Sequence, residues 1–379
     1  MKQNRSIRYK MKTTWLLVLM ILVDACVERI DFDVPPAQFQ MVIEGTITDS
    51  PGPYTVKVTT ALSINQDSSL VTSVENANIL LIDDEGNEED LVEVSPGTYV
   101  TGGIIQGQVG HAYHVVVKTE NGKIFESAPD TLKSVGAVEN IRYEFESRVI
   151  KQPYGEVQAD VFNVYVDADA GEGENNYMRW RFTGTYKVLT YPQFHLTYYR
   201  DYVPYKSPPP CSGYVLVGGP GGGLLVQVGP CECCTCWAKQ FESLPQLSDM
   251  QLISGSKFKN VKVGEVPISN ATFFEKYMVE IEQMSLSRNS FDFFKLIRAQ
   301  KLGASSLFQP PSGEIRGNIK AVNNHDPVVG LFWATSIKKK SIFIYPSDIP
   351  YRVPPIEYIT DDCSTSYPNS STTKPTSWD

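Results

Sequence analysis

The sequence predicts a mostly β protein: an N-terminal immunoglobulin-like or transthyretin-like β-sandwich, followed by a larger β-rich domain with one or two helices. Apolar and polar residues alternate in many short runs, which is the period of a half-buried strand. Turn-forming Gly and Pro residues separate these runs. The chain is also rich in tyrosine, with 20 Tyr beside 27 Gly and 25 Pro, as expected of strands and turns rather than helical bundles.

The first domain is expected over residues 39–135. "MVIEGTITD" from Met41 and "YTVKVTT" from Tyr54 alternate, and the turn residues Pro51-Gly52-Pro53 lie between them. "ANILLIDDEGNEEDLVEV" reads as strand, acidic turn and strand, and "HAYHVVVKTENGKIFES" as a hairpin about Asn121-Gly122. Several short strands of this kind in about 95 residues predict a small sandwich.

A second, larger β-rich domain is expected over residues 136–362. Its predicted strands include "ADVFNVYVDA", "NYMRWRFTGTYKV", "KYMVEIEQM", "IRGNIKAV", "VVGLFWATS" and "SIFIY", and the loop 323–327 is predicted to join two of them as a hairpin. One helix is predicted over Ser287 to Gln300, with Ser287 or Asn289 as its cap. Residues 363–379 form a polar tail that we expect to be disordered.

The N-terminus has the features of a secretory leader, residues 1–25. Basic residues without acids precede the apolar run "WLLVLMILV", which is too short to span a hydrocarbon core of roughly 30 Å. The run ends in "LVDAC", which resembles a bacterial lipobox in which Cys26 is acylated, although Asp24 is unusual there. An ordinary secretory signal with a chance cysteine is the alternative. Initiation at Met1 or at Met11 fits equally.

The expected lipid-anchored protein would lie in the periplasm or on the outer surface of a bacterial envelope, with residues 26–38 as an acidic, proline-bearing tether. Two or more acyl chains on Cys26 would give stable attachment to the bilayer. The formal net charge of −9 argues against nucleic acid, since phosphate binding needs clustered Lys and Arg.

Six cysteines remain after Cys26, and four of them crowd into "CECCTCW". The six are Cys211, Cys231, Cys233, Cys234, Cys236 and Cys363. An oxidising compartment favours disulfides, and six cysteines allow 15 connectivities. We expect the vicinal Cys233 and Cys234 not to pair with each other, one cysteine of the cluster to reach Cys211 and another to reach Cys363. The overlapping C-x-x-C spacings leave a zinc site and a redox site as alternatives.

The aromatic segment from Tyr186 to Tyr205 and the segment from Gly218 to Trp237 are expected to form two arms that contact a partner or ligand. Tyrosine offers a large amphipathic contact area, although packing on the inner face of a sheet would also explain the pattern. The candidate surface residues are Tyr186, Tyr191, Phe194, Tyr198, Tyr199, Tyr202, Tyr205 and Trp237.

The other chemistries find little support. Asp167, Asp169, Glu172 and Glu174 could gather around calcium, but their spacing is not that of an EF-hand, and an acidic turn is the alternative. The glycine run from Gly218 lacks the G-K-S/T of a phosphate loop. No catalytic residues and no cofactor are predicted, and the chain is expected not to be an enzyme.

Four stretches together resemble a domain-of-unknown-function family of Bacteroidota outer-membrane lipoproteins. Beside the lipobox these are "VIEGTITDSPGPYTVKV", "DADAGEGENNYMRWRF", the Cys236-Trp237 pair and "RGNIKAVNNHDPVVGLFWA". Such proteins are typically encoded beside TonB-dependent receptors, so the resemblance implies outer-membrane placement and a receptor-associated role. It also makes Thr131, in "DTL", a candidate for O-glycosylation.

The expected function is therefore that of a non-enzymatic accessory or ligand-binding subunit, whose partner is a TonB-dependent outer-membrane β-barrel receptor. Two alternatives remain. One is a structural or assembly component of the outer envelope. The other is a secreted hydrolase, which would need two carboxylates at catalytic separation in a deep cleft.

Overall fold

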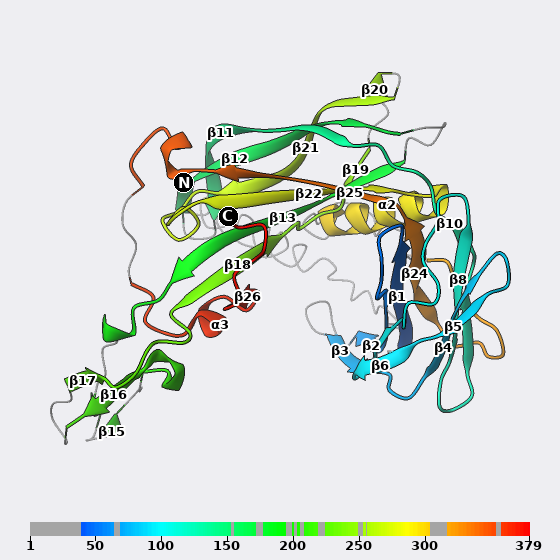
Figure 1. Cartoon of the computed structure of the whole chain (residues 1–379), viewed down its shortest axis with the longest axis horizontal. Helices are drawn as coiled ribbons and strands as arrows, with labels where there is room; N and C mark the ends of the chain where they lie inside the picture. Colours follow the sequence, from blue (N-terminus) through cyan, green and yellow to red (C-terminus); the bar gives the residue numbers. More distant parts are fainter. Residues whose placement is uncertain are drawn as a thin grey trace, which may run out of the picture. The chain divides into compact units, whose positions relative to one another are not determined.

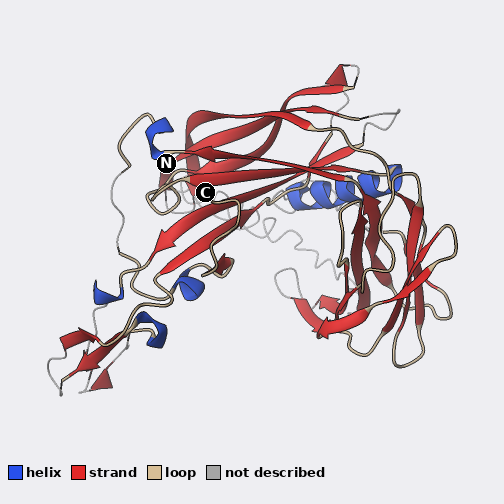
Figure 2. Ribbon diagram, viewed as in Figure 1, coloured by secondary structure: helices blue, strands red, loops and turns tan. Residues whose placement is uncertain are grey.

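The computed structural model describes residues 39–379 apart from eleven short segments, and residues 39–379 form one compact unit. The segments left out are 64–68, 153–154, 172–176, 195–198, 201–202, 205–207, 219–223, 249–252, 255, 304–316 and 354–357. The prediction of a mostly β fold is confirmed, since strands dominate the described residues (Figure 2). Within the described part, no helix is both long enough and apolar enough to cross a membrane.

The first half of the chain folds into two facing sheets. One has the order β24-β1-β2-β7-β6, with β3 beside β2, and the other has the order β23-β9-β8-β4-β5, with β10 beside β8. The strands of these sheets are β1 (Gln40–Thr48), β2 (Thr55–Ser63), β3 (Ser69–Ser73), β4 (Asn78–Asp83), β5 (Glu88–Asp90), β6 (Val92–Ser95), β7 (Thr98–Val100), β8 (Ala112–Lys118), β9 (Ile124–Ser127), β10 (Asp130–Thr131), β23 (Ile319–Ala321) and β24 (Val328–Thr335). Alternate residues such as Ile43, Val58, Val115 and Phe125 point between the sheets and form one buried core.

Two strands from late in the sequence complete this first sandwich. β24 pairs in parallel with β1, with Ile43 opposite Gly330, and β23 pairs with β9 (Figure 1). The predicted hairpin across residues 323–327 is therefore wrong, because β23 and β24 pair with strands of opposite sheets rather than with each other. The predicted division at residue 135 lies just before β11, but strands of the later region belong to the earlier sheets.

A second sandwich follows, built from longer strands. Its sheets have the orders β11-β12-β21-β20 and β25-β22-β13-β18-β26, with β19 beside β13. The strands are β11 (Val138–Gln152), β12 (Gly155–Asp169), β13 (Met178–Leu189), β18 (Thr235–Phe241), β19 (Gln246–Leu247), β20 (Ile253–Ser254), β21 (Lys257–Pro267), β22 (Tyr277–Ser285), β25 (Ile337–Ile344) and β26 (Ser370–Ser371). Trp180, Phe162 and Phe258 belong to its buried core.

Helix α2 (Arg288–Gly303) confirms the predicted helix to within a few residues. The Ser287 hydroxyl accepts a hydrogen bond from the Ser290 backbone N–H (3.2 Å), which makes Ser287 the N-cap. Phe291 and Phe294 on one face of α2 pack in a small cluster with Trp333 of β24. The helix therefore contacts both sandwiches.

The C-terminal residues 363–379 fold onto the second sandwich, contrary to the expected disordered tail. Trp378 is only 3% exposed and packs edge-on against Trp237 and Phe343. The Lys276 ammonium lies 3.9 Å from the Phe343 ring centroid and 5.2 Å from that of Trp378. The segment is also attached to the sheet by the pairing of β26 with β18.

Candidate functional site

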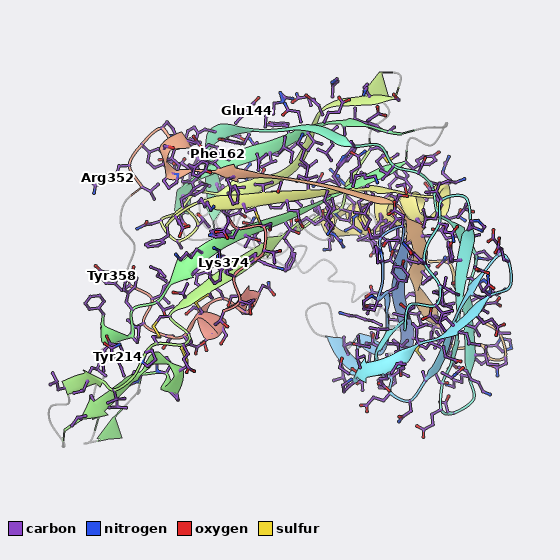
Figure 3. All side chains as sticks on the ribbon, viewed as in Figure 1. Glu144, Phe162, Tyr214, Arg352, Tyr358 and Lys374 are labelled. Atoms are coloured by element: carbon purple, nitrogen blue, oxygen red, sulfur yellow. A yellow bond between two sulfur atoms is a disulfide. The ribbon has the colours of Figure 1, made fainter. Side chains whose placement is uncertain are left out.

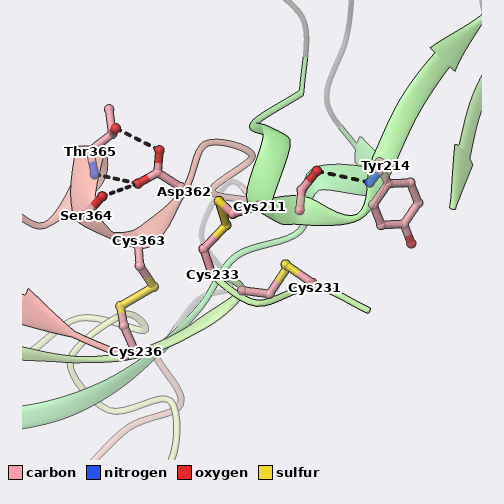
Figure 4. The surroundings of a disulfide bond; sticks show 11 residues. Cys211, Tyr214, Cys231, Cys233, Cys236, Asp362, Cys363, Ser364 and Thr365 are labelled. Atoms are coloured by element: carbon pink, nitrogen blue, oxygen red, sulfur yellow. Dashed lines mark hydrogen bonds between the residues drawn. A yellow bond between two sulfur atoms is a disulfide. The ribbon is translucent and has the colours of Figure 1, made fainter. Parts of the chain in front are cut away.

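Strands β13 and β18 support the cysteine-rich part of the chain. They pair antiparallel from Thr183–Phe241 to Leu189–Thr235, and the Thr190 N–H continues the ladder by donating to the Cys234 carbonyl (2.9 Å). Cys236 of β18 is fully buried and bonded to Cys363, the first residue of the short helix α3 (Cys363–Ser366) (Figure 4). This disulfide links residues 127 apart and holds the C-terminal segment beside β18.

The Asp362 carboxylate caps the N-terminus of α3. It accepts hydrogen bonds from the Thr365 backbone N–H and hydroxyl (both 2.8 Å) and from the Ser364 hydroxyl (Figure 4). These donors, that of Ser364 first, lower the pKa of Asp362 to about 2. The carboxylate therefore stays ionised and keeps α3 in place at any ordinary pH.

The other four cysteines form two adjoining disulfides, Cys211–Cys233 and Cys231–Cys234. Vicinal Cys233 and Cys234 thus belong to different bridges, and Cys211 and Cys363 both reach the cluster, in agreement with the expected pairings. Every one of the six sulfur atoms is bonded to another sulfur, so in this state none is a thiolate that could bind zinc. The group 208–234, with its two bridges, is called the braced arm below.

The braced arm carries a two-stranded ribbon, β16 (Tyr214–Val217) and β17 (Leu224–Gln227). Its base is closed by backbone contacts, because the Gly213 carbonyl accepts from the Val228 N–H (2.8 Å) and the Cys211 carbonyl from the Glu232 N–H (2.9 Å). Gly213 has φ +72°, and a Cβ there would lie 2.3 Å from the Gly229 carbonyl oxygen. Only glycine fits this close crossing.

One face of the ribbon is apolar and open to solvent. Val215 and Val217 alternate with their neighbours along β16, and Leu224 lies opposite Val217, so all three share a face. They are 40%, 54% and 70% exposed, and Val228 just beyond is 66% exposed. An isolated two-stranded ribbon is only marginally stable in water. The two disulfides at its base therefore supply stability that it does not gain from packing against a core.

An exposed aromatic cluster lies near the end of β13. Tyr191 and Phe194 contact Tyr358, with ring centroids 5.0 and 4.4 Å away; Phe194 is the last residue of the 3-10 helix η1 (Pro192–Phe194), and Tyr191 directly precedes it. The Tyr191 N–H donates to the Ile359 carbonyl (2.7 Å), and Phe194 and Tyr358 are 48% and 60% exposed. Figure 3 shows Tyr358 and Tyr214 at the same end of the second sandwich. Tyr358 is a contact residue that the sequence analysis missed.

The remaining aromatic candidates divide into two groups. Tyr186 stacks on Tyr277 at 5.6 Å and meets Tyr367 edge-on, and burial raises its pKa to about 12, so it packs in the interior rather than presenting a free surface. Trp237 is half-buried and meets Trp378 edge-on. Tyr198, Tyr202 and Tyr205 lie outside the described residues, and Tyr199 is described only as part of the two-residue strand β14 (Tyr199–Arg200).

Two of the four acidic residues predicted as calcium ligands make other contacts in the fold. The Asp169 carboxylate contacts the Lys257 ammonium (2.7 Å) and the Gly171 N–H (2.8 Å), and both lower its pKa, the lysine more. Asp167 accepts from the Asn260 N–H (2.8 Å). Glu172 and Glu174 lie outside the described residues, and the described residues hold no group of three ligands that could bind a metal.

The remaining modification candidates are a threonine in the first sandwich and the cysteine of the lipobox. Thr131 lies half-buried in β10, opposite Ala112. Cys26 precedes the described residues.

Comparison with known families gives one match. A family model described as "Domain of unknown function (DUF4249)" matches residues 27–341. Neither the curated proteins nor the solved structures contain a match to this chain. The match covers the first sandwich, the braced arm and the second sandwich as far as residue 341 in β25.

Proposed function

The chain belongs to the DUF4249 family, and from this premise we propose that it is a surface-exposed outer-membrane lipoprotein acting as a non-enzymatic accessory or ligand-binding subunit of a TonB-dependent receptor complex. The braced arm is the docking element in this proposal. Acylated Cys26 and the tether 26–38 hold the two sandwiches at the bilayer, where a β-barrel receptor is within reach.

Two observations support the location. The family match begins at residue 27, which leaves the leader and Cys26 outside the matched domain, as expected for a segment that is removed or lipidated. Three disulfides are compatible with an oxidising compartment and would be rare in a bacterial cytosol.

The apolar face of the braced arm carries the proposed docking role. Val215, Val217 and Leu224 contribute to none of the buried cores, so their apolar character does not serve folding of the two sandwiches. Contiguous exposed apolar surface marks an interaction site, and a rigid, pre-ordered element loses less entropy on binding than a free loop. The disulfides provide that rigidity.

Replacing Val217 and Leu224 together by Glu is expected to weaken receptor binding about 100-fold. Each aliphatic side chain contributes roughly 1.5 kcal/mol or more when it is buried at an interface, and a buried carboxylate adds a desolvation cost. The measurement is affinity purification of the tagged protein from native outer membranes, with the recovered β-barrel protein quantified by mass spectrometry.

Val92→Glu with Val94→Glu is the matched control, because these residues on β6 are 62% and 59% exposed and lie in the first sandwich. The control should recover the barrel as well as the unmodified protein does. Equal recovery from both double variants, or no barrel even with the unmodified protein, would refute the docking proposal. Cys26→Ser tests the anchor separately: it should abolish acyl labelling and release the protein from the membrane fraction.

A further inference from the structure

An open cavity of about 600 Å³ lies between the two sheets of the second sandwich, away from the braced arm's ribbon. Its walls come from β13, β18 and β21, from the segment 242–247 that follows β18, and from α2, which contributes Arg298. This volume is within the range of small-molecule sites in proteins. Four separate stretches of sequence meet here, so no local sequence motif predicts the cavity.

The cavity lining carries two carboxylates and two cations, Lys262 and Arg298. The two carboxylates are Glu242 and Glu265, and each already has an arginine partner, Arg179 and Arg148 respectively. Lys262 adds a further cation 2.7 Å from Glu265. Together these contacts, those of Arg148 first, lower the pKa of Glu265 to about 2. The Glu265 carboxylate therefore stays ionised and cannot act as a proton donor at ordinary pH.

Arg298, at the cavity wall, has no carboxylate partner among the described residues, and neither has Lys301, which lies three residues further along α2 and outside the lining. The Arg298 guanidinium donates to the Pro245 carbonyl (3.0 Å) and the Gln246 side-chain oxygen (2.9 Å). The Lys301 ammonium donates to the Ser243 carbonyl (3.0 Å). Both bind neutral oxygens, so their charge is not cancelled locally. Because Glu242 and Glu265 are both paired with other cations, the Arg298 guanidinium is the charge in the lining that remains for a ligand.

The cavity also offers apolar surface beside its charge. Phe182 lies buried at the wall, Leu244 and Leu247 line it, and Phe241 is 53% exposed. An exposed phenyl ring next to hydrogen-bond donors suits a small ring whose face is apolar and whose edge is polar. Inorganic anions would use the charge and leave this surface unused.

We propose that this cavity binds a small carboxylate-bearing ligand of about the size of one sugar ring, with Arg298 as the principal contact to the carboxylate. The guanidinium has N–H groups beyond those given to Pro245 and Gln246, and it can present them to a carboxylate as a planar fork. The inference does not rest on the proposed receptor, since the purified protein alone should bind the ligand.

The test is isothermal titration calorimetry of the purified soluble chain with glucuronate, glucose and inorganic phosphate as probes. Glucuronate should bind saturably and more tightly than the other two. Arg298→Gln should weaken glucuronate binding by about 10- to 100-fold, the value of one charge-assisted contact, whereas Arg298→Lys should retain part of the affinity. Arg288→Gln is the control, because Arg288 lies on the same helix ten residues earlier and its side chain is 68% exposed.

Each other outcome overturns the proposal. Equal binding of glucose would remove the role of the carboxylate, and equal binding of phosphate would remove the role of the ring. Glucuronate binding that is unchanged in Arg298→Gln would place the site elsewhere, and the absence of saturable binding would leave the cavity without this function. Circular dichroism of Arg298→Gln should match the unmodified protein, and the lysine variant decides the result if it does not.

Discussion

Gly330→Ala is expected to lower the free energy of unfolding by more than about 4 kcal/mol. Gly330 lies in β24 opposite Ile43 of β1, and a Cβ at this position would sit 1.9 Å from the Ile43 carbonyl oxygen. Both partners are backbone of directly paired strands in the first sandwich and cannot rotate away as a side chain could. The clash can be relieved only by separating the parallel strands, which removes ladder hydrogen bonds and opens the core.

Gly155→Ala is the control, because it introduces backbone strain without a steric clash. Gly155 has φ +141° and Gly330 has φ +128°, both in a region that favours glycine, but a Cβ at Gly155 would meet nothing within 4 Å. The control should therefore cost only about 1–3 kcal/mol. Urea unfolding followed by far-ultraviolet circular dichroism measures both variants, and equal losses would show that close contact between β1 and β24 is not what Gly330 provides.

The pairing of β24 with β1 also shows where sequence reasoning ends. Period-two patterns correctly predicted strands at Met41 and Val328, because alternation reports which face of a strand is buried. The pattern carries no information on the neighbouring strand, and here the Thr46 hydroxyl donates to the Trp333 carbonyl across 287 residues. Partner choice is a tertiary property, so the predicted local hairpin at 323–327 was the wrong solution.

The candidate sites divide in the same way. Composition and compartment predicted disulfides at the cysteine cluster, but the choice among 15 connectivities needed distances. Tyr186 looked like a surface residue because no sequence signal separates it from Phe194, whereas Tyr277 covers it in the fold. The cavity beside Arg298 was not predicted at all, because Arg298 and Glu242 are unremarkable in the sequence until the fold brings them together.

Asp130→Ala is expected to cost about 3–5 kcal/mol, although the residue looks like part of a simple turn in the sequence. Asp130 is 3% exposed, and its Oδ2 accepts hydrogen bonds from the Ala334 N–H of β24 (2.9 Å) and the Ser290 hydroxyl of α2 (3.1 Å). Ala334 and Ser290 are themselves buried, so alanine at 130 leaves their donors without an acceptor, at about 1–3 kcal/mol each. Asp90→Ala, at an exposed position of β5, should change stability by less than about 0.5 kcal/mol.

Asp130→Asn should be tolerated much better, with a pH dependence of predictable sign. The amide oxygen can accept the same two hydrogen bonds without carrying charge.

Burial is the largest influence on the pKa of Asp130 and raises it above 3.8, against the opposing hydrogen bonds from Ser287, Ala334 and Ser290. A raised folded pKa means that the carboxyl group contributes stability below pH 3.8 and loses it as the pH rises through the folded value. The stability of the unmodified protein relative to Asp130→Asn should therefore increase as the pH falls from 7 to about 4. Urea midpoints of the two proteins across that range measure their difference in stability. A difference that stays constant, or that changes in the opposite direction, would show that burial does not destabilise the ionised Asp130 carboxylate.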